Sequence, residues 1–575
     1  MLAGLLLLTG CTTIPNSSSP QVVRTLNRGN AESPQASITP QPGDEPREVV
    51  LKFIAAAVLA GAQHSASRQF LTVAEARKWQ DNTTTVLAAT NPEVPGAYND
   101  SHTRTTVVMR AERVGQLNPA GVYTPTLKNL GKGDTESFTY VLVKVGGQWR
   151  IDQAPPGVLV NRDVFEASFP ASMLYFLNAA SADNSQGALV PDVRYSSLTN
   201  QALASWLLGQ LLAGPRPELA QSVLSEVPDQ GVKSSVLLGD PITVEMPGSS
   251  QLDIAGRNAL AAQLAFTFTT FEYSGAELML TDGGRPVRIP VAGGTIFNQN
   301  DFNPAPPASA KAYYLHDGVV IDASDGLPLG GRLGQAGLDS VALRDGPEGL
   351  QAAGVLQNSL LVGTESSLNR VVGIPPGELS RPEWRPHIGD VWVGAKGAIY
   401  RVTPGGQATA VSITSPAGGS LTGQVLALRF SSDGVRLVAA VRAPDGTAAA
   451  WVGSVVTSGT DVRIESFEPV TPVQLVVTDV AWLEDTKLLV IGAAAGSNGG
   501  VAQVWRLASD GAKLDPIPNG LLPPGPLTAI AARNGQTLVS ASGSIWARAT
   551  ETTQDWSPYP ATKPSTQGTN PIFAE

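Results

Sequence analysis

The spacing of hydrophobic positions is helical at the start of the folded part of the chain. Apolar residues between positions 49 and 54 recur at i, i+3 and i+4, which predicts a helix that begins near Arg47. Thr72 and Glu75 have the spacing of a capping box and predict the start of a second helix. From Thr83 onward the hydrophobic period becomes two. We therefore expect two helices followed by strands.

The strands that follow have the pattern of an antiparallel sheet. Residues 105–114 predict one strand, and residues 140–145 and 148–151 predict a hairpin joined by Gly146-Gly147. Two helices before a curved sheet that ends in the string GGQWRI resemble a small NTF2-like α+β domain over residues 47–155. We expect Trp79 and Trp149 in its core, because large aromatic side chains are usually buried.

The next segment, residues 163–300, predicts a compact α/β unit. Gly214-Pro215 ends the first of its two helices, and Asp282-Gly283-Gly284 predicts a hairpin turn. The expected elements are a strand at 173–177, a turn into another strand at 189–194, helices at 201–213 and 254–271, and a hairpin pairing 278–281 with 287–291. The strings LYFLN, LVPDVRY and LLGQLLAGPRPEL resemble the GerMN domain of sporulation and germination proteins, which brings no catalytic motif.

One charged pair in this unit has two interpretations. Asp192 and Arg194 could bind a ligand, or they could form a solvated pair in a turn. We expect the solvated pair, because exposed charges are usually only solvated.

The remainder, residues 311–560, predicts short strands with a recurring phrase. A hydrophobic run, a polar turn and a second hydrophobic run appear at 425–441, 480–491 and 530–539. Spacing of about 50 residues indicates a β-propeller of roughly five to six blades, whereas a β-sandwich would not explain the recurrence. Asp-Gly pairs predict hairpin turns, since such corners need positive φ. They begin at Asp325, Asp345, Asp433, Asp445 and Asp510.

Composition agrees with a multidomain, mainly β protein. The chain has 575 residues, more than one core usually organises, and its 59 Gly and 44 Pro are typical of many turns. A net charge of −10 predicts no electrostatic surface for holding phosphate backbones or an anionic bilayer face, so we do not expect nucleic acid as a partner. The single cysteine excludes a disulfide framework and a CxxC metal or redox site.

That cysteine ends the most specific motif in the sequence. An apolar stretch from Met1 leads into Leu8, Thr9, Gly10 and Cys11, which resembles a bacterial lipobox. In such signals Cys11 receives a diacylglyceryl group and becomes the first mature residue, with acyl chains such as palmitate. Two or more acyl chains anchor a protein stably. We expect residues 1–11 to be the signal peptide with the lipidated cysteine, and residues 12–46 to be a polar, disordered stalk.

Catalytic motifs are missing from the sequence. The four histidines, His64, His102, His316 and His387, lie far apart, and there is no HExxH, P-loop, GxGxxG after a strand, or GxSxG elbow. Each histidine is expected to be a surface or hydrogen-bonded core residue, and Glu484-Asp485 a solvated turn. We predict no enzyme, no cofactor and no metal site, although two glycosidase carboxylates need only meet in space.

The order of parts narrows the assignment. A lipobox, a polar stalk, a domain opening with PREVVLKFIAAAV, a GerMN-like domain and a degenerate propeller together resemble the LpqB family of actinobacterial lipoproteins over essentially the whole mature chain. The resemblance implies a lipid-anchored extracytoplasmic protein of the cell membrane. Its implied partner is the extracytoplasmic part of the sensor histidine kinase MtrB of the MtrAB two-component system, with effects on cell-wall homeostasis and division. The contact residues are unknown.

Two other functions stay open. The propeller face could bind a cell-wall glycan or peptide, which would need an exposed aromatic platform. The chain could also be a cryptic hydrolase, which would need a pair of carboxylates in a cleft.

Overall fold

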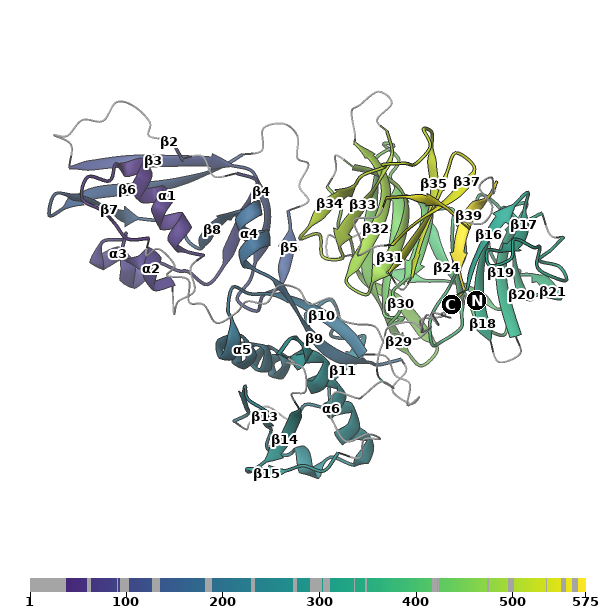
Figure 1. Cartoon of the computed structure of the whole chain (residues 1–575), viewed down its shortest axis with the longest axis horizontal. Helices are drawn as coiled ribbons and strands as arrows, with labels where there is room; N and C mark the ends of the chain where they lie inside the picture. Colours follow the sequence, from purple (N-terminus) through teal and green to yellow (C-terminus); the bar gives the residue numbers. More distant parts are fainter. Residues whose placement is uncertain are drawn as a thin grey trace, which may run out of the picture.

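Three folded parts make up the computed structural model of the chain (Figure 1). It describes residues 38–58, 64–89, 92–93, 103–126, 135–180, 189–228, 233–271, 277–289, 302, 311–335, 337–346, 349–415, 421, 423–472, 475–494, 501–533, 535–549, 555–560 and 567–574. We call the parts the N-terminal domain (38–169), the middle domain (171–289) and the propeller (311–574). The chain is multidomain and mainly β, as the sequence predicts.

The N-terminal domain opens with short helices. They are α1 (Pro46–Ala56), α2 (Ser65–Arg68) and α3 (Val73–Lys78). The predicted N-cap at Thr72 is confirmed, since its side chain accepts the Glu75 amide at 3.3 Å. The predicted capping box is wrong, however: the Glu75 carboxylate accepts the amide of Ala154 at 2.9 Å and so joins α3 to the end of the sheet.

Two four-stranded sheets follow in this domain, in the orders β5-β4-β1-β8 and β2-β3-β6-β7. The strands are β1 (Thr84–Leu87), β2 (Pro92–Glu93), β3 (Arg104–Ala111), β4 (Arg113–Leu117), β5 (Tyr123–Pro125), β6 (Glu136–Val145), β7 (Gln148–Gln153) and β8 (Val158–Asn161). The predicted β6–β7 hairpin is confirmed, and both of its turn glycines have positive φ. A last helix, α4 (Arg162–Ser168), is capped by Asn161.

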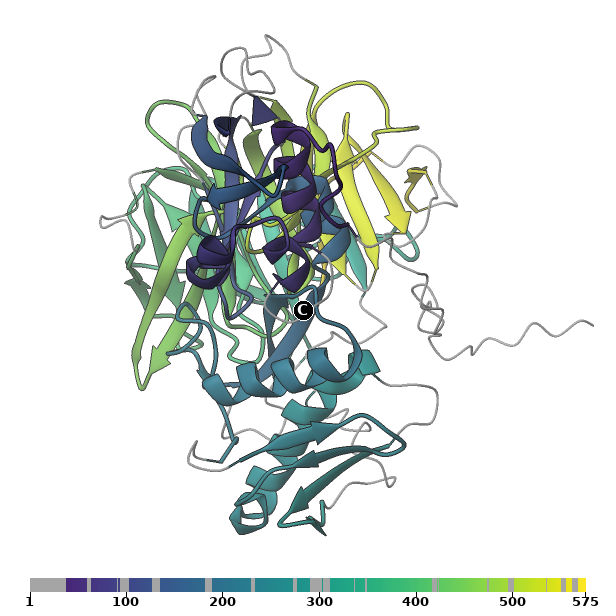
Figure 2. The ribbon, with the colours of Figure 1, turned by 90° about the vertical axis from the view of Figure 1, so that its left-hand side faces the viewer.

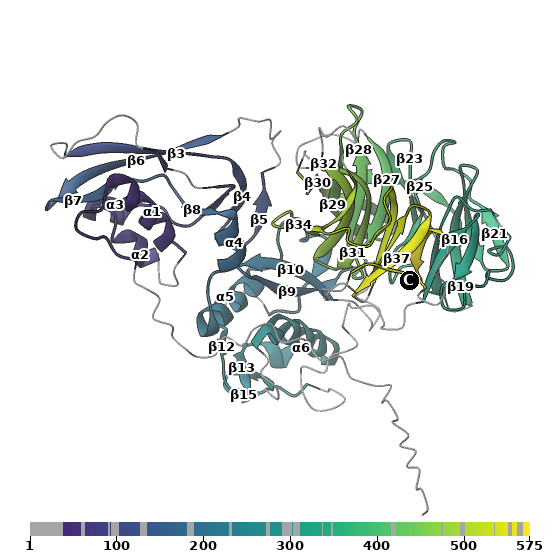
Figure 3. The same cartoon turned by 45° about the horizontal axis from the view of Figure 1, so that its top comes forward.

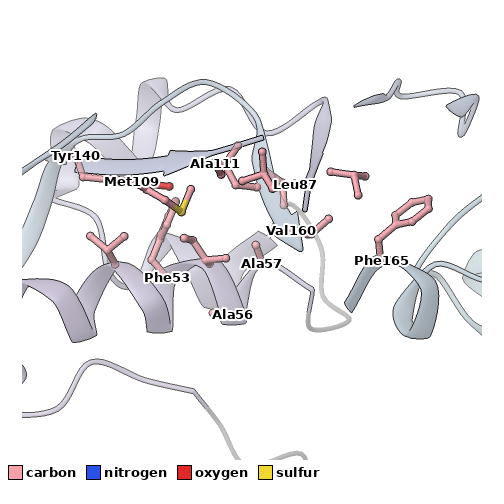
Figure 4. Packing of buried hydrophobic residues seen from close by; sticks show 14 of the residues in the cluster. Phe53, Ala56, Ala57, Leu87, Met109, Ala111, Tyr140, Val160 and Phe165 are labelled. Atoms are coloured by element: carbon pink, nitrogen blue, oxygen red, sulfur yellow. The ribbon is translucent and has the colours of Figure 1, made fainter. Parts of the chain in front are cut away.

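The core of the N-terminal domain lies between α1 and the inner face of the sheets (Figure 4). Phe53 of α1 packs edge-on against Trp79 and Tyr140, with ring centroids 5.0 and 6.0 Å apart. Phe165 of α4 belongs to the same core. Trp79 and Trp149 are buried, as predicted.

The middle domain combines two small sheets with two long helices. The sheets have the orders β10-β9-β11 and β12-β13-β14-β15. The elements are β9 (Ala171–Asn178), β10 (Leu189–Tyr195), α5 (Asn200–Ala213), β11 (Val223–Leu224), β12 (Ser235–Leu237), β13 (Ile242–Glu245), η2 (Ser249–Gln251), α6 (Ile254–Phe268), η3 (Thr269–Phe271), β14 (Leu278–Asp282) and β15 (Arg285–Pro286). The hairpin turn after β14 is confirmed. Its second strand is at 285–286, residues 287–289 are not part of it, and residues 290–291 of the predicted strand lie outside the described residues.

The propeller contains six sheets within the described residues. Blade 1 is β17-β16-β39, blade 2 is β18 to β21, blade 3 is β22 to β25, blade 4 is β26 to β30, blade 5 is β31 to β34 and blade 6 is β35 to β38. The C-terminal strand β39 pairs with β16 and closes the ring. The recurring phrases of the sequence are the first hairpins of blades 4, 5 and 6.

The strand bounds of the propeller are β16 (Ala312–His316), β17 (Val319–Asp322), β18 (Ser340–Gly346), β19 (Gly349–Leu356), β20 (Ser359–Thr364), β21 (Ser367–Arg370), β22 (Glu383–Trp384), β23 (Val391–Ala395), β24 (Ala398–Val402), β25 (Ala408–Ala410), β26 (Ser412–Ile413), β27 (Gln424–Phe430), β28 (Arg436–Arg442), β29 (Ala448–Ser458), β30 (Asp461–Pro469), β31 (Leu475–Glu484), β32 (Lys487–Ala494), β33 (Gln503–Ala508), β34 (Leu514–Ile517), β35 (Leu527–Arg533), β36 (Gln536–Ala541), β37 (Ser544–Ala549), β38 (Ser557–Pro558) and β39 (Thr569–Phe573).

A buried ion pair ties the blades together around the propeller axis. Arg381, just before blade 3, pairs with Asp479 of blade 5 at 3.3 Å and donates to the carbonyls of Ile530 in blade 6 and Pro571 in blade 1. Both charged side chains are less than 10% exposed. Because one arginine bridges four blades, we infer that it helps to hold the closing strand in place.

The three parts lie against one another. The propeller stands beside the N-terminal domain, and the middle domain lies below both, a relation that a turn of 90° preserves (Figures 1 and 2). Strands β9 and β10 and the turn before β34 meet where the three parts come together (Figure 3). Within the described residues, no helix is long and apolar enough to cross a membrane.

Candidate functional site at the domain junction

The predicted lipidation motif, Leu8, Thr9, Gly10 and Cys11, lies outside the described residues. It therefore stays a prediction. What the structure adds is a set of buried polar contacts at the junction of the three domains, built around two turns of the propeller.

The first turn, Ser431–Val435, joins β27 to β28 and is organised by one carboxylate. Asp433 accepts hydrogen bonds from the Ser431 hydroxyl at 2.5 Å and the Val435 amide at 2.7 Å. Its other oxygen pairs with the Arg436 guanidinium at 2.7 Å. Asp433 is completely buried, so this ion pair is shielded from solvent. Removing either partner would leave an uncompensated charge.

The same turn binds the middle domain. Arg436 donates to the carbonyl of Pro191 in β10, and Asn178 at the end of β9 donates to the carbonyl of Asp433 at 2.8 Å. Val435, also completely buried, belongs to the hydrophobic core of the middle domain. The turn therefore contributes both apolar packing and hydrogen bonds to the interface between the propeller and the middle domain.

A second carboxylate supports this turn from the neighbouring blade. Asp485, in the first hairpin of blade 5, accepts the Ser432 amide at 2.9 Å and the Ser432 hydroxyl at 2.5 Å. Burial, followed by the negative charge of Asp433, raises the pKa of Asp485 to about 7, against the lowering effects of Ser432 and Arg436. The prediction of a solvated Glu484-Asp485 pair is wrong for Asp485, which is partly buried, whereas Glu484 is exposed and pairs with Lys487.

The second turn joins β33 to β34 and contacts the other two domains. The Tyr195 hydroxyl of the middle domain donates to Asp510 at 3.3 Å, and the Ala512 amide donates to the same carboxylate oxygen at 3.1 Å. Ala512 belongs to the core of the N-terminal domain, and Lys513 pairs with Glu166 of α4 at 3.5 Å. Burial raises the pKa of Asp510, mainly against the charge of Arg216, which lowers it.

A buried charge network lies behind this contact in the middle domain. Asp192 pairs with Arg194 at 2.9 Å and with Arg216 at 2.7 Å, and Arg216 also donates to the Val193 carbonyl. Asp192 is completely buried and Arg194 is 2% exposed. The expectation of a solvated turn pair is therefore wrong, because residues 189–195 form the strand β10 and not a turn. The network fixes the loop after α5 to β10.

The histidines of the described residues take part in ordinary hydrogen bonds or lie at the surface. One ring nitrogen of His64 lies 2.8 Å from the Ala57 carbonyl, and one of His387 lies 3.0 Å from the Ser432 carbonyl. His316 is partly exposed beside Asp317, and His102 lies outside the described residues. No group of three or more His, Cys, Asp or Glu side chains in the described part could hold a metal ion.

Sequence reasoning missed Asn178, Val435 and Arg436 as contact residues and took Asp433 and Asp510 only as turn formers. One signal was available in the sequence: an arginine three residues after Asp433, at the start of a strand, can form an ion pair with that carboxylate. The partners Asn178 and Pro191 are more than 240 residues away in the sequence, so no local pattern marks them.

Comparison with protein families places these parts in one class of protein. A family model described as "Lipoprotein LpqB, N-terminal domain" matches residues 39–166, and one described as "Lipoprotein LpqB beta-propeller domain" matches residues 319–574. Between them, a model described as "Sporulation and spore germination" matches residues 173–295. The three parts define a bacterial lipoprotein with a C-terminal propeller. The chain belongs to the LpqB lipoprotein family.

Curated relatives match nearly the full length. "Lipoprotein LpqB" of Rhodococcus jostii is 29% identical over 95% of this chain and 92% of its own length. "Lipoprotein LpqB" of Nocardia farcinica is 27% identical over 97% of this chain and 95% of its own length. Among solved structures, the Cps50 (Swd1) β-propeller domain of Myceliophteria thermophila covers 36% of this chain and 64% of its own, with 10% identity and a TM-score of 0.26. That score is too low to support any statement about function.

Proposed function

We propose that this chain is a membrane-anchored lipoprotein that binds the extracytoplasmic part of the sensor histidine kinase MtrB and modulates the MtrAB system, with effects on cell-wall homeostasis and division. The observation that carries the proposal is the match of the N-terminal domain and the propeller to LpqB family models, in the order of the full-length relatives. Catalysis is not part of the proposal.

The domain junction supports a role in binding. Buried contacts from two propeller turns join the three domains, so a partner that contacts several of them meets surfaces held in a defined relation. Attachment through Cys11 would confine this body to the membrane of the kinase and raise the effective concentration of a weak contact. To regulate, the protein must bind one kinase conformation better than another. A difference of about 1 to 3 kcal/mol changes the conformational ratio by roughly 5- to 150-fold.

The two other functions have less support. A glycan platform requires exposed aromatic rings, and the large hydrophobic side chains that are exposed in the described residues are all Val, Leu or Ile. A hydrolase requires two carboxylates that reach a substrate. One interacting carboxylate pair of the described residues, Asp433 and Asp485, already binds Arg436 and Ser432 at the domain junction.

The test is affinity capture from actinobacterial membranes with the mature protein, followed by binding of the purified soluble parts. The Cys11→Ala protein separates anchoring from recognition: it should lose membrane attachment but still bind the purified kinase ectodomain. The ectodomain of an unrelated sensor kinase is the matched control. Recovery of wall fragments without kinase, or equal binding of both ectodomains, would overturn the proposal.

A further inference from the structure

One face of the sheet β2-β3-β6-β7 is not covered by a helix of its own domain. The inner face packs against α1 through buried residues such as Val107, Met109 and Leu142. On the outer face, Val108, Val141 and Val143 are only partly buried. This face lies on the side of the N-terminal domain opposite α1 to α3 and points away from the middle domain (Figure 1).

Arginines flank the valines at the centre of this outer face. Arg104, Val143 and Arg150 lie directly opposite one another across three neighbouring strands, and Arg110 lies farther along β3 on the same face. The Arg104 side chain is 58% exposed and pairs loosely with Asp152 at 3.5 Å, and Arg110 is exposed. In a chain of net charge −10, the three arginines of this face outnumber its two acidic residues, Asp152 and Glu93, which lies opposite Val108 in the register.

The chain enters the domain on the α1 side of this sheet, near its edge strand β7. The pKa of Asp44 lies below its ordinary value: burial raises it, but the Lys52 hydrogen bond, the Gln41 amide and the charges of Lys52 and Arg150 outweigh burial. Asp44, which precedes α1, pairs with Lys52 of that helix, and the charge of Arg150 on the edge strand β7 also acts on it. Fewer than about 30 residues separate Cys11 from the first described residue, a reach of at most roughly 100 Å when fully extended.

We propose that the outer face of this sheet, with Arg104, Arg110 and Arg150, docks onto anionic lipid headgroups of the membrane that holds the acyl anchor. Guanidinium groups match phosphate oxygens in geometry and charge. A second copy of the chain is a poor occupant, because two such faces would bring arginines against arginines. Each basic side chain near an anionic bilayer strengthens binding by roughly fivefold. The anchor supplies proximity, and this face would set the orientation.

The experiment measures vesicle binding without the contribution of the anchor. The full chain with Cys11→Ala is mixed with phosphatidylcholine vesicles that contain either none or about one third phosphatidylglycerol, and bound protein is measured by flotation. We expect binding only to the anionic vesicles, and less binding at high salt because the Debye length shortens. Arg104→Glu with Arg110→Glu should weaken it roughly tenfold or more.

The matched control reverses two exposed propeller arginines, Arg370→Glu with Arg442→Glu, which changes the net charge equally and should leave vesicle binding unchanged. Arg104→Gln with Arg110→Gln guards against a folding defect and should give an intermediate loss. Unchanged binding of the Arg104/Arg110 reversal, or an equal loss in the control, overturns the proposal. The proposal is also overturned if the Arg104→Glu, Arg110→Glu variant keeps its vesicle binding and loses only its binding to the kinase ectodomain, since this face would then bind protein. Kinase capture by soluble parts is scored separately, so either proposal can fail alone.

Discussion

Two turns of blade 4 have the same local chemistry and different surroundings. Asp433-Gly434 and Asp445-Gly446 end the two hairpins that share β28, and both glycines have positive φ, at 69° and 87°. Each aspartate accepts the backbone amide two residues later, at 2.7 Å from Val435 and 2.9 Å from Thr447. Asp433 is completely buried against another domain, whereas Asp445 is exposed.

The difference arises from which face of the propeller each turn occupies. Turns that join the first to the second strand and the third to the fourth strand of a blade lie on one face, and both turns that enter the junction are of these types. Asp445 lies between the second and third strands, at the other end of the blade. The Asp-Gly pair sets the turn, and its position in the blade decides whether the turn also holds the domains together.

The largest effect is expected when the buried charge pair is broken. Asp433→Ala leaves Arg436 uncompensated in the interior and should lower the free energy of unfolding by about 3 to 5 kcal/mol. Asp445→Ala, the matched control, should cost far less because only an exposed turn contact is lost. Chemical denaturation of both variants checks this, and equal losses would mean that burial at the junction is energetically irrelevant.

A smaller effect is expected at the second turn. Asp510→Ala removes the acceptor for Tyr195 and for the Ala512 amide, so that buried donors lose their partner. The expected cost is about 1 to 3 kcal/mol. Limited proteolysis should also detect easier separation of the propeller from the other domains. A variant as stable and as resistant as the parent would show that this contact does not join them.

The smallest effect concerns pH. Because the pKa of Asp485 is raised to about 7, the folded state holds this proton more tightly than the unfolded chain does, where the ordinary value is 3.8. The associated stability is present below that ordinary value and is lost as the pH rises through about 7. Between pH 6 and pH 7 the change should be on the order of 1 kcal/mol.

Asp485→Asn should remove this part of the pH dependence when unfolding is measured at several pH values. Asp445→Asn is the control. The pKa of Asp445 is lowered, first by the Thr447 side chain and then by its amide, so its contribution does not change between pH 6 and pH 7. Parallel pH profiles for the parent and Asp485→Asn would contradict the role given to this carboxylate.

Local patterns predicted most of the elements but not how they were joined. The helical period at residues 49–54, the Gly146-Gly147 hairpin and the repeated blade hairpins are confirmed, because each depends on residues that are near in the sequence. The prediction of Asp192 and Arg194 as a solvated turn is wrong. The second partner of Asp192, Arg216, follows α5 and is therefore distant in the sequence. The bridge of Arg381 across four blades likewise has no local signal.

The sequence by itself determined the mainly β, multidomain class and the family, because periodicity, turn residues and the order of domains are written along the chain. It also carries the predicted lipid attachment at Cys11. Only the tertiary structure decided which Asp-Gly turn is buried between two domains. The free-energy cost of burying a charged carboxylate depends on the groups around it. Around the Asp433 turn these groups include Asn178 and Pro191 from another domain.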